Sequence, residues 1–390
     1  MWIVLLINFV ATSTVYIGAK LSLLTSISSL SFEEDRSQEV ESVDLTLGQV
    51  LVLPFSSSVV LLLLFFYFQY IQYVLLALLV FVSASALNAL LFLLLQSVYK
   101  ERTNKLACHC ISIMLTLGLV LYWIATGDLI IHNILGCALC ITFISTLKFP
   151  SLKIAVVCLV LLTVYDIFWV FFSEYFFREN VMIDVAQKVA ANPVHTVGKY
   201  LKNDYVTSLV KSKIELPLKL IFKNFSTGKM MILGLGDIAL PGALVALALR
   251  CDESITREQS GGDRDSAVAT KTCDLESTES SDKYSYGEKL SLSINESYYN
   301  KKVVDAKDSS YSSSSIHSTP VVPSRLFDCA VLGYTSGLFV AFAASIVSGH
   351  GQPALIYLVP GVLLPIVGRA WFVGKLRHVW HGPEKIQESS

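Results

Sequence analysis

Two aspartates stand alone in apolar runs of the sequence. Asp166 is the only acidic residue between positions 153 and 173, and Asp237 is the only one between positions 230 and 250. A membrane-spanning helix needs about 20 apolar residues, and both runs reach that length. Because an ionisable group costs about 2.5–3.5 kcal/mol at the centre of an inserted helix, each aspartate is a candidate functional residue. A single acid of this kind also fits an ion pair or a proton relay.

The two carboxylates are expected at one depth in the membrane. Asp166 precedes Ser173 by seven residues, and Asp237 follows Met230 by seven residues. The segment between the two runs must begin and end on one side of the membrane, so the two helices are antiparallel. A rise of about 1.5 Å per residue then places both acids about 10 Å below that side. Two acids at one depth can meet and share a proton.

A pair of carboxyl groups that shares one proton can hydrolyse an amide. Two carboxylates a few ångströms apart do not easily both ionise, so they titrate as a coupled pair. The ionised acid takes a proton from a water molecule held between them, while the protonated acid donates a hydrogen bond to the scissile carbonyl group. The sequence does not assign the proton to either aspartate.

Small and helix-breaking residues accompany the acids. Gly234 and Gly236 leave room for another backbone to approach Asp237. Pro241 removes a helix hydrogen bond one turn later, and Pro353 stands where a helix is expected to begin. The glycines alone are more typical of close helix packing. The combination, rather than any one residue, indicates a protease site.

The composition indicates a polytopic membrane protein. The chain has 390 residues, of which 53% are hydrophobic and only 16% are charged, whereas soluble domains carry about 25% charged residues. The net charge of −1 says nothing about nucleic-acid binding, and no basic patch suggests it, so we expect no nucleic-acid partner. Because no set of cysteines and histidines completes a tetrahedral site, we expect no metal and no cofactor.

We expect an all-α bundle of nine transmembrane helices. A turn at residues 69–72 should divide the longest apolar block into two spans. The expected spans are residues 1–24, 49–68, 69–98, 107–126, 129–147, 153–173, 230–250, 327–348 and 353–373. The resulting organisation is helices one to seven in residues 1–251 with a lumenal loop at 174–229, a disordered Ser-rich cytosolic insertion at 252–325, helices eight and nine in 326–376, and a cytosolic tail at 377–390.

The basic residues of the short loops predict the orientation. Lys and Arg occur in the loops after the third and fifth expected spans and at the C-terminal end, whereas the loops near Gln69, Gly127 and Gly349 carry none. Basic short loops stay on the cytosolic side. The N-terminus is therefore expected in the lumen and the C-terminus in the cytosol, which makes the shared face of the two aspartates lumenal.

A short strand is expected just ahead of the second aspartate. Residues 216–222 alternate enough to form one, and its edge could pair with an unwound substrate segment. A surface loop or an interfacial segment fits this pattern equally well.

Three motifs resemble those of the presenilin and signal peptide peptidase family. Tyr165-Asp166 is similar to the YD motif, residues 234–237 to the GxGD motif, and Pro353-Ala354-Leu355 to the PAL motif. The order and the spacing of these motifs, together with the nine-span layout, agree with the pattern of that family. Further stretches, at residues 149–153, 165–172, 180–182 and 352–360, most resemble the signal-peptide-peptidase-like 3 branch.

The resemblance implies a presenilin-like bundle and an intramembrane aspartyl protease. Asp166 and Asp237 would be catalytic, and the site would be shaped by Tyr165, Gly234, Gly236, Gln352, Pro353, Ala354 and Leu355. The implied substrates are single-span type II membrane proteins, with glycosyltransferases as candidates, whose ectodomains are released. The implied location is the endomembrane system, with the Golgi favoured over the endoplasmic reticulum. Whether the chain forms a homo-oligomer stays open.

Two other classes of function remain to be weighed. A transporter or ion channel could use the two aspartates as a proton or cation relay, and a membrane chaperone could hold client helices without chemistry. A transporter more often shows repeated halves, and this sequence has no internal repeat. The paired aspartates, the glycines and the third motif favour the protease.

Overall fold

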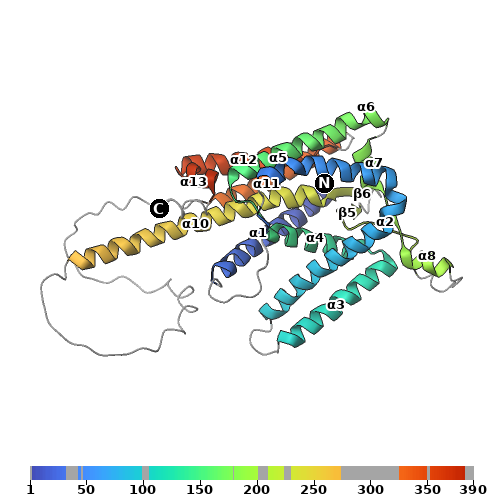
Figure 1. Cartoon of the computed structure of the whole chain (residues 1–390), viewed down its shortest axis with the longest axis horizontal. Coiled ribbons are helices and arrows are strands. Elements are labelled where there is room, and N and C mark those ends of the chain that lie inside the picture. The colour runs from blue at the N-terminus through green and yellow to red at the C-terminus, as the bar shows by residue number, and fades with distance from the viewer. Residues whose placement is uncertain are drawn as a thin grey trace. The chain divides into compact units, whose positions relative to one another are not determined.

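The computed structural model of the chain describes residues 2–31, 43–44, 47–98, 105–178, 180–200, 210–223, 230–273, 325–348 and 352–382 (Figure 1). The chain divides into two units, one comprising Met1–Ile255 with Ser324–Ser390 and the other Thr256–Pro323. The first unit contains both aspartates and all three motifs.

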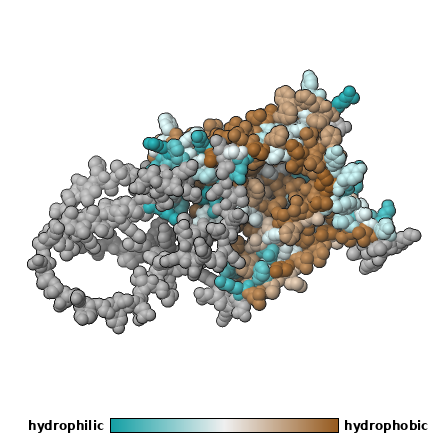
Figure 2. All heavy atoms as spheres, viewed as in Figure 1, coloured by the Kyte–Doolittle hydropathy of each residue, from teal (hydrophilic) through white to brown (hydrophobic). Residues whose placement is uncertain are grey.

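Seven helices in the described part of the chain are long and apolar enough to cross a membrane. They span Trp2–Ser26, Gly48–Val98, Lys105–Thr126, Leu129–Thr146, Leu152–Phe177, Leu326–Ser348 and Leu355–Phe372. Large apolar side chains such as Phe9, Phe81 and Trp371 are exposed on them, and Figure 2 shows a broad hydrophobic surface over this unit. Because exposed apolar surface of this extent is typical of contact with lipid, the chain is a mostly helical, polytopic membrane protein.

The helices and strands have the following bounds. The helices are α1 (Trp2–Ser31), α2 (Leu47–Val98), α3 (Lys105–Thr126), α4 (Leu129–Thr146), α5 (Leu152–Ile167), the π-helix η1 (Phe168–Phe172), α6 (Ser173–Phe177), α7 (Val181–Gln187), α8 (Pro193–Tyr200), α10 (Leu235–Cys273), α11 (Leu326–Ser348), α12 (Leu355–Phe372) and α13 (Leu376–His381). The strands are β1 (Val43–Asp44), β2 (Leu147–Lys148), β3 (Ala190–Ala191), β4 (Lys213–Ile214), β5 (Lys219–Lys223) and β6 (Met230–Gly234).

Helix α2 corrects the predicted turn at residues 69–72, which are helical. The helix breaks two residues earlier, at Tyr67, where φ is −112° and ψ is 16°. Lys188 stabilises the break, because its Nζ donates to the carbonyl oxygen of Phe65 at 2.8 Å and lies over the Phe65 and Phe68 rings. Carbonyl groups at a helix end lack intrahelical donors, and a lysine from a distant segment supplies one here.

The second aspartate follows a strand rather than lying inside a continuous helix. Residues 230–234 form β6, which pairs antiparallel with β5 from Lys219↔Gly234 to Lys223↔Met230. The expected helix over 230–250 therefore begins only at Leu235. Because an extended residue rises about 3.3 Å rather than 1.5 Å, the depth derived from helical rise over 230–237 is wrong. The expected strand at 216–222 likewise begins later, at Lys219.

Glycines bring the backbones of α11 and α12 into direct contact. A Cβ atom on Gly333 would collide with the carbonyl oxygen of Gly361, and one on Gly337 would lie 3.0 Å from that of Tyr357. Small residues at a crossing permit this close approach. Helices α5 and α11 both pack against α12, so the position of α12 beside α5 depends on these glycines.

Asp252 of α10 lies beside the beginning of α11 within the first unit. The Asp252 carboxylate accepts hydrogen bonds from the backbone N–H groups of Leu326 at 3.0 Å and Phe327 at 2.8 Å, and so caps α11. Helix α10 continues to Cys273, through the first part of the expected insertion at 252–325. Residues 274–324 lie outside the described part, as does most of the expected tail.

Candidate active site

Asp166 lies at the end of α5, where the helix changes type. Its side chain is 3% exposed, and η1 begins two residues later. The widened turn of η1 is held by side chains from elsewhere: the Asn180 amide donates to the Val170 carbonyl oxygen at 2.6 Å, and the Trp169 indole donates to Ser58 Oγ at 3.1 Å. π-Helical turns occur frequently at functional sites, and this one adjoins the candidate acid.

Asp237 lies in the first turn of α10, directly after the hairpin. A Cβ atom on Gly234 would lie 3.1 Å from Asp237 Oδ2, so the carboxylate rests against this glycine. Gly236 is exposed, and a Cβ atom there would meet no atom within 4 Å. One glycine thus makes room for the carboxylate, and the other faces open space beside it.

The third motif begins α12 and reaches the first aspartate through its backbone. Pro353 and Leu355 are buried, and α12 begins at Leu355. The first N–H groups of a helix have no intrahelical acceptor, and that of Leu355 donates to the Asp166 carboxylate. The other carboxylate oxygen of Asp166, Oδ2, is buried without a partner among the described residues. The donor and the helix dipole together orient this carboxylate.

The structure brings the two aspartates within electrostatic range of each other. Helices α5 and α10 supply one acid each, and the beginning of α12 lies against the first. Tyr165 adjoins Asp166, and its ring centroid lies 6.4 Å from that of Trp169. Gln352 and Ala354 are partly buried at the beginning of α12, and in the described part no hydrogen bond joins the Gln352 side chain to either acid.

Sequence analysis missed one polar residue beside Asp237. Tyr334 of α11 is fully buried, and its hydroxyl group has no hydrogen-bond partner in the described part of the chain. It lies within electrostatic range of Asp237 and of the Cys140 thiol, which in turn contacts the Leu235 carbonyl oxygen at 3.6 Å. Only its position next to the Gly333-x-x-x-Gly337 packing motif could have pointed to it.

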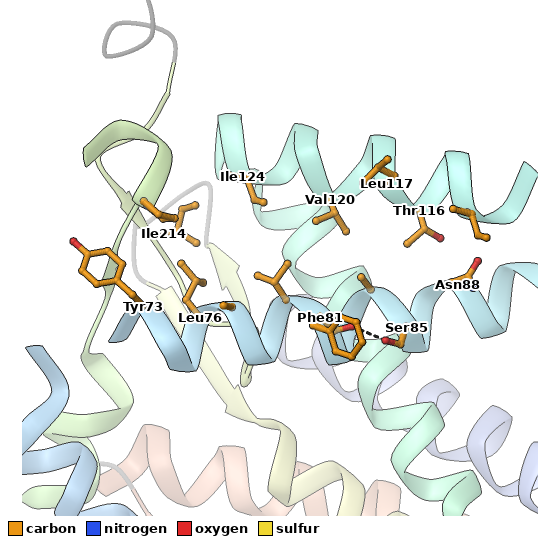
Figure 3. A pocket seen from close by; sticks show the side chains of 15 residues that line it. Tyr73, Leu76, Phe81, Ser85, Asn88, Thr116, Leu117, Val120, Ile124 and Ile214 are labelled. Atoms are coloured by element: carbon orange, nitrogen blue, oxygen red, sulfur yellow. Dashed lines mark hydrogen bonds between the residues drawn. The ribbon is translucent and has the colours of Figure 1, made fainter. Parts of the chain in front are cut away.

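A cavity lies away from the aspartates, between the second half of α2 and α3 (Figure 3). It has a volume of about 630 Å³, and most of its lining is apolar. Its polar residues include Asn88, which accepts a hydrogen bond from Ser112 at 2.7 Å, and Thr116, which is buried. Because neither aspartate lines it, this cavity does not belong to the candidate active site.

Comparison with known protein families finds a match that covers most of the chain. The family model for signal peptide peptidase, Peptidase_A22B, matches residues 36–386. This chain belongs to the signal peptide peptidase family. Membership implies intramembrane protease activity, and the matched residues include both aspartates and the beginning of α12.

Relatives in the family match over most of the chain. The protein named Signal peptide peptidase-like 1 of Oryza sativa subsp. japonica is 32% identical over 380 residues, which cover 91% of this chain and 87% of that protein. The protein of the same name in Arabidopsis thaliana is 32% identical over 375 residues, covering 90% and 86%. Signal peptide peptidase-like 3 of Arabidopsis thaliana is 26% identical over 253 residues, covering 64% and 32%. No solved structure matches the chain.

Proposed function

We propose that this chain is an aspartic endopeptidase that cleaves peptide bonds within membrane-spanning segments, with Asp166 and Asp237 as its catalytic pair. The observation that carries the proposal is the arrangement of the two acids, which lie within electrostatic range of each other while the Leu355 N–H orients the first. One carboxylate takes a proton from the attacking water, and the other carboxyl group donates a hydrogen bond to the scissile carbonyl. Tyr165, Gly234, Gly236 and residues 352–355 shape the site around this pair.

Nine spans would arrange these residues across the membrane. Helix α2 has 52 residues, about 78 Å at 1.5 Å per residue, which far exceeds a hydrocarbon core of about 30 Å. The break at Tyr67 therefore divides it into two spans. Helix α10 supplies the ninth span. Its residues 241–250 are all buried, so this span is surrounded by protein rather than by lipid. The N-terminus is then lumenal and the C-terminus cytosolic.

The substrates we infer are single-span type II membrane proteins, whose lumenal ectodomains are released. Support comes from the neighbours of the two acids along the chain, because η1 follows Asp166 at the C-terminal end of α5 and the β5–β6 hairpin directly precedes Asp237. On the proposed topology this end faces the lumen. Glycosyltransferases and a Golgi location follow only from the family resemblance and remain proposals.

Reconstitution in liposomes tests the protease against the relay. We expect wild-type protein to cleave an added type II membrane protein, and mass spectrometry of the product to place the cut within or beside its membrane span. A proton-sensitive dye inside the same vesicles reports ion movement. Proton flux without any product would contradict the protease and support the transporter.

Substitution of Gly236 by alanine is expected to separate stability from activity. The new methyl group meets open space, and alanine favours a helix over glycine by about 0.5–1 kcal/mol, so the melting temperature should stay equal or rise. Cleavage should fall about 10- to 100-fold, since a substrate backbone would lose its close approach to Asp237. Gly118→Ala on α3, where a Cβ atom also meets open space, should leave cleavage unchanged. Equal activity in both variants would refute the role of Gly236.

A further inference from the structure

One face of α4 is occupied by the hairpin that leads to Asp237. The Asn133 amide donates to the Ile221 carbonyl oxygen at 2.9 Å, and its side-chain oxygen accepts from the Ile221 N–H at 2.9 Å. The His132 Nε2 lies 2.9 Å from the Lys219 carbonyl oxygen and donates to it, because a carbonyl group only accepts. Gly136, one turn later, leaves room for Leu220, whose Cδ2 would lie 3.0 Å from a Cβ atom on Gly136.

The side chains of His132 and Asn133 form hydrogen bonds with backbone groups along one edge of the hairpin, the outer edge of β5. In an antiparallel pair, alternate residues direct their N–H and C=O groups toward the partner strand and the others direct them outward. The contacts with α4 show that residues 219 and 221 of β5 face outward. An asparagine carboxamide presents one donor and one acceptor, like a peptide group, so Asn133 stands in for a neighbouring strand at Ile221.

The same alternation leaves the other edge, beside the catalytic pair, without a backbone partner among the described residues. Leu220 and Phe222 face β6, so their register partners Leu233 and Met231 face β5. The backbone groups of Ile232 and the N–H of Gly234 must then point away from β5. The Ile232 side chain is 43% exposed, and Gly234 contacts the Asp237 carboxylate. An open strand edge is a template for another extended segment.

We propose that Asn133 and His132 are positioning residues that close the β5 edge, so that an extended substrate segment pairs with β6 next to Asp237. This inference rests on the proposed function and adds the residues that hold the pairing edge. Because α4 holds β5 in place before the substrate arrives, ordering β5 does not reduce the free energy of substrate binding. Loss of the clamp should therefore weaken substrate binding more than it slows the chemical step.

Asn133→Leu tests the clamp, because leucine has a similar size and neither donor nor acceptor. Without substrate, hydrogen exchange of the Ile221 amide should accelerate about tenfold or more, since its partner is lost. With a type II substrate, KM should rise about tenfold while kcat changes less than about twofold. Asn133→Asp, which keeps an acceptor for the Ile221 N–H, should give an intermediate exchange rate. Asn8→Leu is the matched control, because Asn8 bonds the Thr335 carbonyl oxygen in another helix pair at 3.1 Å.

A second measurement locates the pairing edge. With substrate bound to the Asp237→Asn variant, hydrogen exchange should slow at Ile232 of β6 and stay unchanged at residues 219 and 221. Protection at β5 instead, or Ile221 exchange in Asn133→Leu equal to that in Asn8→Leu, would overturn the inference. The exchange measurement without substrate does not depend on cleavage, so a wild-type protein that cleaves nothing while Ile221 responds as expected would reject the protease and support the clamp.

Discussion

Replacement of either aspartate of the proposed catalytic pair by asparagine is expected to reduce cleavage by about 10⁴-fold or more, because one substitution removes both the acid and the base function of the shared proton. Asparagine has nearly the same shape as aspartate and cannot ionise. It therefore leaves the packing around Asp166 and Asp237 intact while removing the proton transfer. Product formation by Asp166→Asn and Asp237→Asn in liposomes, quantified by mass spectrometry, measures the effect.

The stability of these variants should move in the opposite direction to their activity. Asp166 is 3% exposed, and its Oδ2 lacks a partner among the described residues. A buried carboxyl group with one oxygen unpaired destabilises the fold, so the melting temperature of Asp166→Asn should equal or exceed that of the wild type. Asp328→Asn, which changes an exposed acid in the first turn of α11, should alter neither quantity. A low melting temperature in Asp166→Asn would attribute lost cleavage to misfolding.

The double variant distinguishes a coupled pair from two independent acids. Residues that act as a unit show grossly non-additive effects on rate. If the two aspartates share one proton, the variant with both asparagines should be no slower than either single variant. Independent contributions would instead multiply, and a double variant slower by the product of the two effects would contradict the shared proton.

Gly333→Ala is expected to impair both stability and cleavage, although it adds only one methyl group and changes neither acid. That methyl group would collide with the carbonyl oxygen of Gly361 on α12, and backbone atoms cannot move aside as a flexible side chain can. Overpacking of this kind costs about 1–3 kcal/mol. The displaced α12 carries Leu355, whose N–H orients Asp166, and a shift of about 1 Å at a catalytic group can cost about 100-fold in rate.

The matched substitution lies on α12 itself. A Cβ atom on Gly368 meets no atom within 4 Å, so Gly368→Ala should keep or raise the melting temperature and leave cleavage unchanged. Thermal unfolding in detergent and the cleavage rate in liposomes check both variants. If Gly333→Ala behaves like Gly368→Ala in both measurements, the α11–α12 contact does not position the site.

The three parts of the candidate site share one structural feature, which is irregular backbone within apolar sequence. Asp166 precedes a π-helix, Asp237 follows a strand-to-helix junction, and Leu355 begins a helix. Irregular backbone at membrane depth is tolerated where protein or water satisfies it. Here the Asn180 side chain donates a hydrogen bond to a backbone carbonyl group of η1, and the Asn133 side chain donates one to a backbone carbonyl group of β5. Such places also provide free backbone donors, as the Leu355 N–H does for Asp166.

The amino-acid sequence by itself determined the family and the class of protein, and it singled out the two candidate acids. A carboxylate is so costly in an apolar run that Asp166 and Asp237 were recognisable without any structure. The apolar runs likewise predicted a polytopic, helical membrane protein, because a bilayer requires helices of about 20 apolar residues. The family prediction made from the three motifs is confirmed by the match over residues 36–386.

The tertiary structure alone decided where those runs stop being helical. Residues 230–234 are apolar enough for a helix, and pairing with β5 makes them a strand. The break of α2 at Tyr67 depends on Lys188, more than 100 positions away in sequence, and the closed edge of β5 depends on Asn133, 88 positions away. Periodicity and composition report only on neighbours along the chain. Contacts between distant segments set the backbone of this site, and only the folded chain displays them.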